Sequence, residues 1–356
     1  MKKFFAVIGN PPYQDDEQDP LYSYFYDAAG KISDRYILIS PARFLFNAGL
    51  TSKEWNKKML NDEHLKVLYF NQNSDEIFQN TDIKGGVAVM YRNSQKIFGA
   101  IKTFIPDEEK RKIAERFNKD EKKNFPSIMH GGRSDLKFND AFLKRYPNTK
   151  ELRLKAIQRK RPETRFLAPN EEYELKSSAF EVLAQSFYEC KPKNEEAYYK
   201  IWGLSNSKRT HRWIEKEYMD LRCEEHNNID SYKVFIPKAI GSGLFGEKIS
   251  DCIVSAPGES ATPTFISIGC YKTEVEAKNT VKYIKTKLVR ALLGLLKITQ
   301  DNVPGKWAYV PLQDFTSKSD IDWTKSVHEI DLQLYEKYDL SKEEKDFIET
   351  HVKEMV

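Results

Sequence analysis

The feature that most constrains this chain is a proline-fixed turn close to its amino terminus. The apolar run Phe4-Phe5-Ala6-Val7-Ile8 is followed by Gly9 and then by Asn10-Pro11-Pro12-Tyr13. The run predicts a short buried strand, and the two prolines fix the backbone of the turn after it. An amide and an aromatic ring are therefore expected at the carboxyl end of a strand, where ligands collect in open α/β sheets.

This turn suits the methylation of an exocyclic amino group on a base. Such a nitrogen is a poor nucleophile because its lone pair is delocalised into the ring. The side-chain oxygen of Asn10 and the backbone carbonyl of Pro11 can both accept its protons, which localises the lone pair for attack on a sulfonium methyl group. The prolines stiffen the backbone that carries these acceptors, as electrostatic preorganisation requires. Tyr13 offers a ring on which a flipped-out base can stack.

The motif also carries a family resemblance. Asn10-Pro11-Pro12-Tyr13 after a hydrophobic strand resembles the catalytic motif of adenine-N6 DNA methyltransferases. The string from Val7 to Gln14 resembles the methylase part of type II restriction-modification enzymes. The resemblance implies that Asn10, Pro11, Pro12 and Tyr13 are catalytic, that S-adenosylmethionine is the methyl donor and that double-stranded DNA is the substrate. A strand-ending turn with two prolines is the alternative interpretation.

The same resemblance adds two expectations about the base. Asn rather than Ser at position 10 favours adenine over cytosine-N4 methylation. Phe78 matches an aromatic residue that packs on the other face of the flipped adenine in related enzymes. A core anchor is the alternative interpretation of Phe78.

The pattern of apolar segments predicts an α/β fold. Residues 36–39, 64–70 and 86–92 are expected to form strands, and residues 21–32 and 51–61 to form helices. This alternation indicates part of a doubly wound sheet. The resemblance implies that it is a partial methyltransferase sheet, followed by a mixed α+β target-recognition domain. The predicted divisions are 1–105 for the catalytic-loop half, 106–165 for a charged helical connector, 166–330 for target recognition and 331–356 for a helical tail.

Three further helices are predicted outside the sheet. Charges at helical spacing predict one over residues 107–123. Apolar periodicity predicts a second from Thr273 to about Leu296. Ser341 and Glu344 have the spacing of a capping box, which predicts a helix start in the tail.

The donor site is expected to be incomplete in this chain. In the family that the motif resembles, a glycine-rich turn well upstream of the catalytic motif binds the donor, whereas nine residues precede Asn10 here. A second polypeptide that supplies this half, or a split or truncated gene, would account for the difference. A G-x-G-x-x-G string at residues 241–246 leaves no room for the helix of a nucleotide-binding turn. These glycines are expected to shape a loop that approaches DNA, and Lys238 and Ser242 are its candidate contacts.

Two basic stretches are the other candidates for contact with DNA. Lysine and arginine can bind phosphates, and Arg209 or Asn206 can reach base edges. For the first stretch, residues 150–165, an exposed amphipathic helix is the alternative interpretation. The candidates are Arg159, Lys160 and Arg161 in the first stretch and Lys208, Arg209, Arg212 and Trp213 in the second.

Composition restricts the remaining classes. The net charge is +4, from 57 basic and 53 acidic residues, which permits a basic face without requiring one. The four cysteines are too far apart to indicate a zinc site or a disulfide framework, so we expect no metal and a reducing compartment. No apolar stretch reaches membrane-spanning length, and we expect a soluble cytoplasmic protein.

Two rival functions stay open at this point. A DNA-binding specificity subunit would share every feature except donor binding and turnover. A nuclease would need clustered acidic residues and a lysine around a magnesium ion. Glu174-Leu175-Lys176 comes nearest to that pattern, but no convincing aspartate precedes it.

Overall fold

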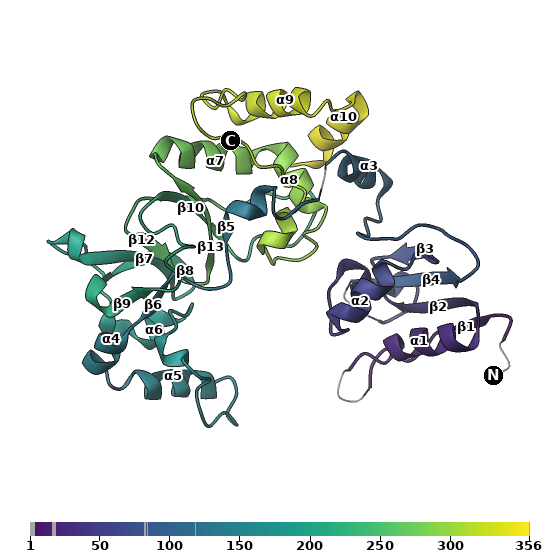
Figure 1. Ribbon diagram of the computed structural model, residues 1–356, viewed down its shortest axis with the longest axis horizontal. Coiled ribbons are helices and arrows are strands. Elements are labelled where there is room, and N and C mark those ends of the chain that lie inside the picture. Colours follow the sequence, from purple (N-terminus) through teal and green to yellow (C-terminus); the bar gives the residue numbers. More distant parts are fainter. Residues whose placement is uncertain (1–3, 16–18, 82, 84, 118, 356) are drawn as a thin grey trace. The chain divides into compact units, whose positions relative to one another are not determined.

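The computed structural model describes residues 4–15, 19–81, 83, 85–117 and 119–355. It is a mixed α/β structure with several sheets (Figure 1). The chain divides into two compact units, Met1–Arg111 and Lys112–Val356. Helix α3 (Glu108–Arg116) contains the boundary between them.

The first unit is built on one sheet. Its elements are β1 (Val7–Gly9), α1 (Tyr22–Ile32), β2 (Arg35–Pro41), α2 (Lys53–Leu60), β3 (Leu65–Asn71) and β4 (Val87–Asn93). The strands lie in the order β1-β2-β4-β3 (Figure 1). β1 and β2 are parallel and are connected through α1, whereas β4 is antiparallel to both β2 and β3. The described sheet is therefore mixed, with a parallel pair at one edge.

Both helices pack on one face of this sheet. The ring of Tyr26 on α1 lies 5.6 Å from that of Tyr36 on β2 and 5.8 Å from that of Trp55 on α2. The hydroxyl of Tyr26 also forms a 2.9 Å hydrogen bond with the hydroxyl of Ser40 on β2. Aromatic rings thus fill the layer between helices and sheet, and burial of this area stabilises the unit by the hydrophobic effect.

The opposite face of the sheet is open at β1. We expected a buried strand at residues 4–8, but Phe4, Phe5 and Ile8 are 63%, 82% and 76% exposed. The prediction of burial is wrong because β1 is an edge strand and Ile8 points away from the helices. Side chains alternate along a strand, so the neighbouring Ile37 and Ile39 of β2 share this face and are half-buried.

The second unit combines several small sheets with helices. β10 is central to the sheet β11-β10-β13-β5, β7 lies between β12 and β8, and β6 pairs with β9. Residues 129–158 lie within this unit and supply two strands and two helices. The elements are β5 (Met129–His130), β6 (Leu136–Phe138), α4 (Asp140–Arg145), α5 (Thr149–Gln158), α6 (Ala179–Val182), β7 (Tyr198–Ser205), β8 (Lys208–Glu215), β9 (Met219–Leu221), β10 (Tyr232–Pro237), β11 (Ile253–Ser255), β12 (Glu259–Ala261), β13 (Phe265–Tyr271), α7 (Glu274–Lys285), α8 (Lys287–Gly294), α9 (Val327–Lys337) and α10 (Lys342–His351).

Two of the predicted helices are shorter than expected. The helix predicted over 107–123 ends at Arg116, and Asp120 instead forms a turn in which its carboxylate accepts the N–H of Lys122. The helix predicted from Thr273 to Leu296 is two helices, α7 and α8, separated at Thr286. Thr286 has extended backbone (ψ 150°), and its hydroxyl caps α8 by accepting the N–H of Val289. The capping box of Ser341 and Glu344 is confirmed at the start of α10.

Candidate active site

The motif lies directly after β1, at the carboxyl end of the strand. Asn10 and Pro12 are exposed, Pro11 is buried and Tyr13 is half-buried. The carbonyl of Tyr13 accepts the N–H of Leu21 at 3.2 Å, which connects the turn to the start of α1. Burial raises the pKa of the Tyr13 hydroxyl, and the nearby Asn10 side chain lowers it in part. The amide and the phenol predicted to act together are thus neighbours in the structure.

Phe78 lies against Tyr13. The two ring centroids are 6.4 Å apart and the ring planes are inclined by 65°. The structure therefore brings together the two aromatic residues that the sequence indicated for base stacking. The rings meet edge to face, so a base could enter between them only if they moved apart.

Ser74 holds the loop that carries Phe78. Its side chain is 4% exposed and forms two hydrogen bonds. The hydroxyl donates to the carbonyl of Thr81 and accepts the N–H of Ile83, both at 2.8 Å. The Ser74 carbonyl also accepts the N–H of Phe78 at 2.8 Å. Hydrogen bonds of the buried Ser74 thus hold together the start and the end of the loop that carries Phe78.

A cavity of about 310 Å³ opens beside Tyr13. Its volume lies at the lower end of the range of about 300–1,000 Å³ found for small-ligand sites. Sequence reasoning missed Arg43 and Leu50 in its wall, because no local pattern shows that the segment after β2 meets Tyr13. The lining residues are Tyr13, Gln14, Pro20, Tyr22, Pro41, Arg43, Leu50 and Ile83.

The first group of predicted DNA contacts lies at the end of α5. Arg159, Lys160 and Arg161 are exposed and follow the last residue of the helix. Arg153, on the same helix, is buried instead. Its guanidinium lies over the ring of Phe138 and donates to the carbonyl of Glu174, and burial lowers its pKa to about 10. In this stretch Arg153 is therefore packed in the interior, and the three basic residues after the helix form an exposed cluster.

The second group lies on the hairpin of β7 and β8. Lys208 and Arg209 are exposed beside its turn. Arg212 lies further along β8, where its guanidinium is 2.6 Å from the carboxylate of Glu189 and stacks over Phe180. Trp213 is 6% exposed, so its ring is not on the surface. Only the end of the hairpin presents its predicted contacts to solvent.

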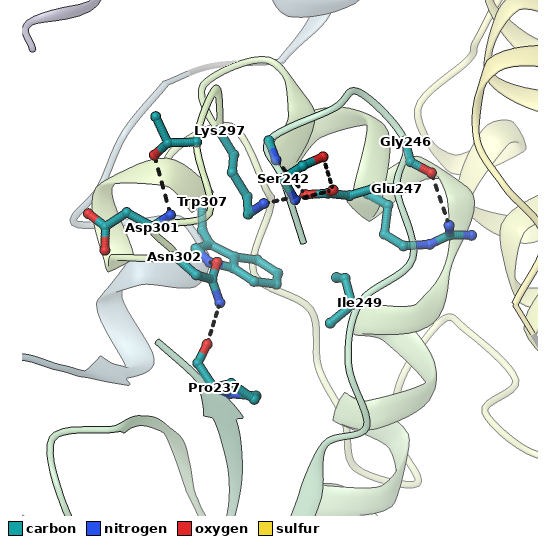
Figure 2. A network of polar contacts seen from close by, with 12 residues as sticks. Pro237, Ser242, Gly246, Glu247, Ile249, Lys297, Asp301, Asn302 and Trp307 are labelled. Carbon is teal, nitrogen blue, oxygen red and sulfur yellow. Dashed lines mark hydrogen bonds and ion pairs between the residues drawn. The ribbon is translucent and has the colours of Figure 1, made fainter. Parts of the chain in front are cut away.

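Hydrogen bonds to an acidic residue hold the glycine-rich loop in place (Figure 2). The carboxylate of Glu247 accepts the N–H groups of Ser242 and Gly243 at 2.7 and 3.1 Å and the hydroxyl of Ser242 at 3.2 Å. It also binds the ammonium of Lys297, whose side chain is 3% exposed. The next regular element after the glycines is β11, so no helix opens there. An internal carboxylate thus occupies the N–H groups that would otherwise face an anion.

Gly243 and Lys238 also have structural roles in and beside this loop. Gly243 has φ +93°, and a Cβ there would lie 2.3 Å from the carbonyl carbon of Ile298. Lys238 follows β10 and is half-buried. Its backbone donates to Thr264 and accepts from Asn302, both at 2.8 Å. Contact of Lys238 and Ser242 with DNA stays a prediction.

The described residues contain no group of three or more His, Cys, Asp or Glu side chains placed to hold a metal ion. Cys190, Cys223, Cys252 and Cys270 are free thiols. Burial raises the pKa of Cys252 to about 12, so this thiol is protonated at neutral pH. No described helix has both the length and the apolar character to cross a membrane.

A family model matches part of the first unit. Residues 1–78 match the family model for the Eco57I restriction-modification methylase. A search of curated proteins finds no match. The matched segment includes the turn after β1 and ends at Phe78, and therefore contains both rings described above. The match links this segment to DNA methylation in restriction-modification systems, and a methylase in general implies S-adenosylmethionine as donor.

Proposed function

We propose that this chain takes part in site-specific methylation of the N6 amino group of adenine in double-stranded DNA, within a restriction-modification system. One observation carries the proposal. The Asn10-Pro11-Pro12-Tyr13 turn lies at the carboxyl end of β1, with Phe78 against Tyr13, inside the segment that matches a restriction-modification methylase. The identity of the base as adenine rests on Asn at position 10 and its resemblance to the adenine-specific motif.

The residues of the turn have separate roles in this proposal. The Asn10 side-chain oxygen and the Pro11 carbonyl accept the two amino hydrogens and orient the nitrogen lone pair. The rings of Tyr13 and Phe78 move apart, and Tyr13 then stacks on one face of the flipped adenine and Phe78 on the other. Pro12 keeps the turn rigid, so the acceptors need no reorganisation during the reaction.

The glycine-rich string at residues 241–246 does not fit S-adenosylmethionine. The one G-x-G-x-x-G string has its N–H groups bound to Glu247 and opens no helix. We therefore propose that a second polypeptide supplies the donor-binding half. The open edge of β1 supports this, since an edge strand presents unpaired backbone groups to a further strand. A strand added there would lie next to Asn10.

The second candidate function is a DNA-recognition subunit that retains the motif without turnover. The observation that favours it is the same lack of fit between the glycine-rich string and the donor. In both cases we propose that the second unit binds the duplex.

Calorimetric titration tests whether this chain needs a second polypeptide to bind the donor. S-adenosylmethionine is titrated into the purified chain, alone and with duplex DNA. Heat of binding at micromolar affinity would show that this chain forms its own donor site and would contradict the need for a second polypeptide. Its absence under both conditions would leave a chain that needs a partner or only recognises DNA.

Substitution of the catalytic amide tests the role of Asn10. In a preparation that methylates DNA, Asn10→Ala is expected to lower the turnover number by a factor of about 100 or more, the usual effect of deleting one preorganised electrostatic group. Asn194→Ala is the control, because Asn194 is exposed in the second unit. Equal turnover of the two variants would contradict the assigned role.

A further inference from the structure

The hairpin of β7 and β8 is a two-stranded ribbon from Gly203 to its turn, and β12 pairs with β7 nearer the root, at residues 200–202. Its register runs without a break from the pair Tyr198 and Glu215 to the pair Ser205 and Lys208. The turn has two residues, Asn206 and Ser207, with φ angles of +49° and +62°. Two successive left-handed residues are typical of the type I′ turn, whose twist matches that of the strands. The ribbon therefore keeps its twist up to the turn.

The hairpin lies beside β12 in the second unit (Figure 1), and contacts with the rest of the unit fix both its root and its turn. Ile201 on β7 and Ile214 on β8 are fully buried. A Cβ at Gly203 would lie 2.8 Å from the Phe180 ring, so the strand passes close to that ring. The N–H of Asn206 donates to the carboxylate of Glu181 at 3.1 Å. The turn is thus held by the body of the unit and does not depend on a ligand for its shape.

The end of the ribbon has a composition suited to an anionic partner. Asn206, Ser207, Lys208 and Arg209 are four consecutive exposed residues. Lys208 and Arg209 carry adjacent positive charges whose side chains leave opposite faces of the strand. Together these four residues, the hairpin tip, present an amide, a hydroxyl, an ammonium and a guanidinium group.

We propose that the hairpin tip enters the major groove of duplex DNA, an inference that rests on the proposed function. The major groove is about 12 Å wide and admits a two-stranded ribbon, whereas the minor groove is about 6 Å wide. Lys208 binds a phosphate at the groove edge and Arg209 reaches guanine edges, to which its guanidinium fork is complementary. The deep, narrow major groove of duplex RNA does not admit such a ribbon.

The test compares two duplexes of the same mixed sequence. In one, every cytosine carries a glucosylated hydroxymethyl group at C5, which fills the major groove and leaves the phosphates and the minor groove unchanged. Binding of the full chain is measured by fluorescence anisotropy at several salt concentrations. We expect the modified duplex to bind on the order of tenfold more weakly, the cost of losing a base contact.

The variant Lys208→Ala/Arg209→Ala is expected to bind the plain duplex more weakly and to lose the discrimination between duplexes. Its salt slope should fall by about 0.9, since the variant loses the phosphate contact of Lys208. The control Lys122→Ala/Lys123→Ala removes two exposed lysines elsewhere in the second unit and should behave as the parent chain. Thermal unfolding of both variants is measured alongside.

Equal affinity of the parent chain for the two duplexes would overturn the inference, as would discrimination that survives in the tip variant. Tighter binding of an RNA duplex of the same sequence would overturn it in favour of RNA. The proposed function fails separately. If the hairpin tip discriminates between the two duplexes but no preparation transfers a methyl group, the proposed methylase function is refuted and this inference stands.

Discussion

Single residues determine what the candidate site can do. Tyr13 and Asn10 were identified from sequence because their chemistry and their place after an apolar run agree. Phe78 was identified by resemblance alone, and its contact with Tyr13 is a tertiary fact that no local pattern contains. The roles of Ser74, Arg43 and Leu50 were missed, since they depend on which segments meet in the folded chain.

Phe78 offers a test between base stacking and core packing. If it is a stacking residue, Phe78→Ala should change the unfolding midpoint little, because the ring is half-buried and contacts Tyr13 at the site. Phe44→Ala is the matched control, since Phe44 is fully buried in the same unit and its loss should cost about 3–5 kcal/mol. The measurement is urea unfolding of both variants. Comparable destabilisation would make Phe78 a core anchor.

Elements followed from the sequence when their signals were local. The capping box of Ser341 and Glu344 needs only two residues three positions apart, and it was found. The break at Thr286 was missed because apolar periodicity continues across it. The break is stabilised by α9, where the carboxylate of Asp331 accepts the N–H groups of Lys287 and Leu288 at 2.8 and 3.0 Å. Contacts between distant segments thus decide where a long helix is divided.

Asp331 also makes the stability of this region depend on pH. The residue is 1% exposed, and burial raises the pKa of its carboxyl group to about 6, from 3.8. The folded state therefore binds a proton more tightly than the unfolded state. As the pH rises from about 4 to about 6, this group should lower the free energy of unfolding by an amount on the order of 3 kcal/mol.

Urea unfolding from pH 4 to pH 8 checks this prediction. The variant Asp331→Asn cannot ionise, so its stability should decline less over the interval from pH 4 to 6 than that of the parent chain. Above pH 6 the difference between the two should be constant. Parallel curves across the whole range would show that the Asp331 carboxyl group titrates at the same pH in the folded and unfolded states.

At the scale of the whole molecule, the order of strands and helices in the first unit was predictable from the sequence. The solvent exposure of its first apolar segment was not. The predicted segments 21–32, 36–39, 64–70 and 86–92 each contain the corresponding helix or strand core. An apolar run such as residues 4–8 predicts burial, but burial depends on which other segments are present to cover it. The structure leaves that run exposed beside a half-buried row of side chains on β2.

This open edge predicts self-association in the absence of a partner. Among the described residues no strand pairs with the outer edge of β1, and Phe5 and Ile8 are exposed beside it. Such a surface is the kind that joins another chain or aggregates. Sedimentation velocity should show species that grow with concentration, and Ile8→Lys should shift the distribution toward monomer because a lysine there opposes edge-to-edge pairing. Leu332→Lys is the control, since Leu332 is 47% exposed on α9 in the other unit. If the parent chain stays monomeric at all concentrations, exposure of β1 is tolerated without a partner, and the argument for a second polypeptide at this edge loses its structural support.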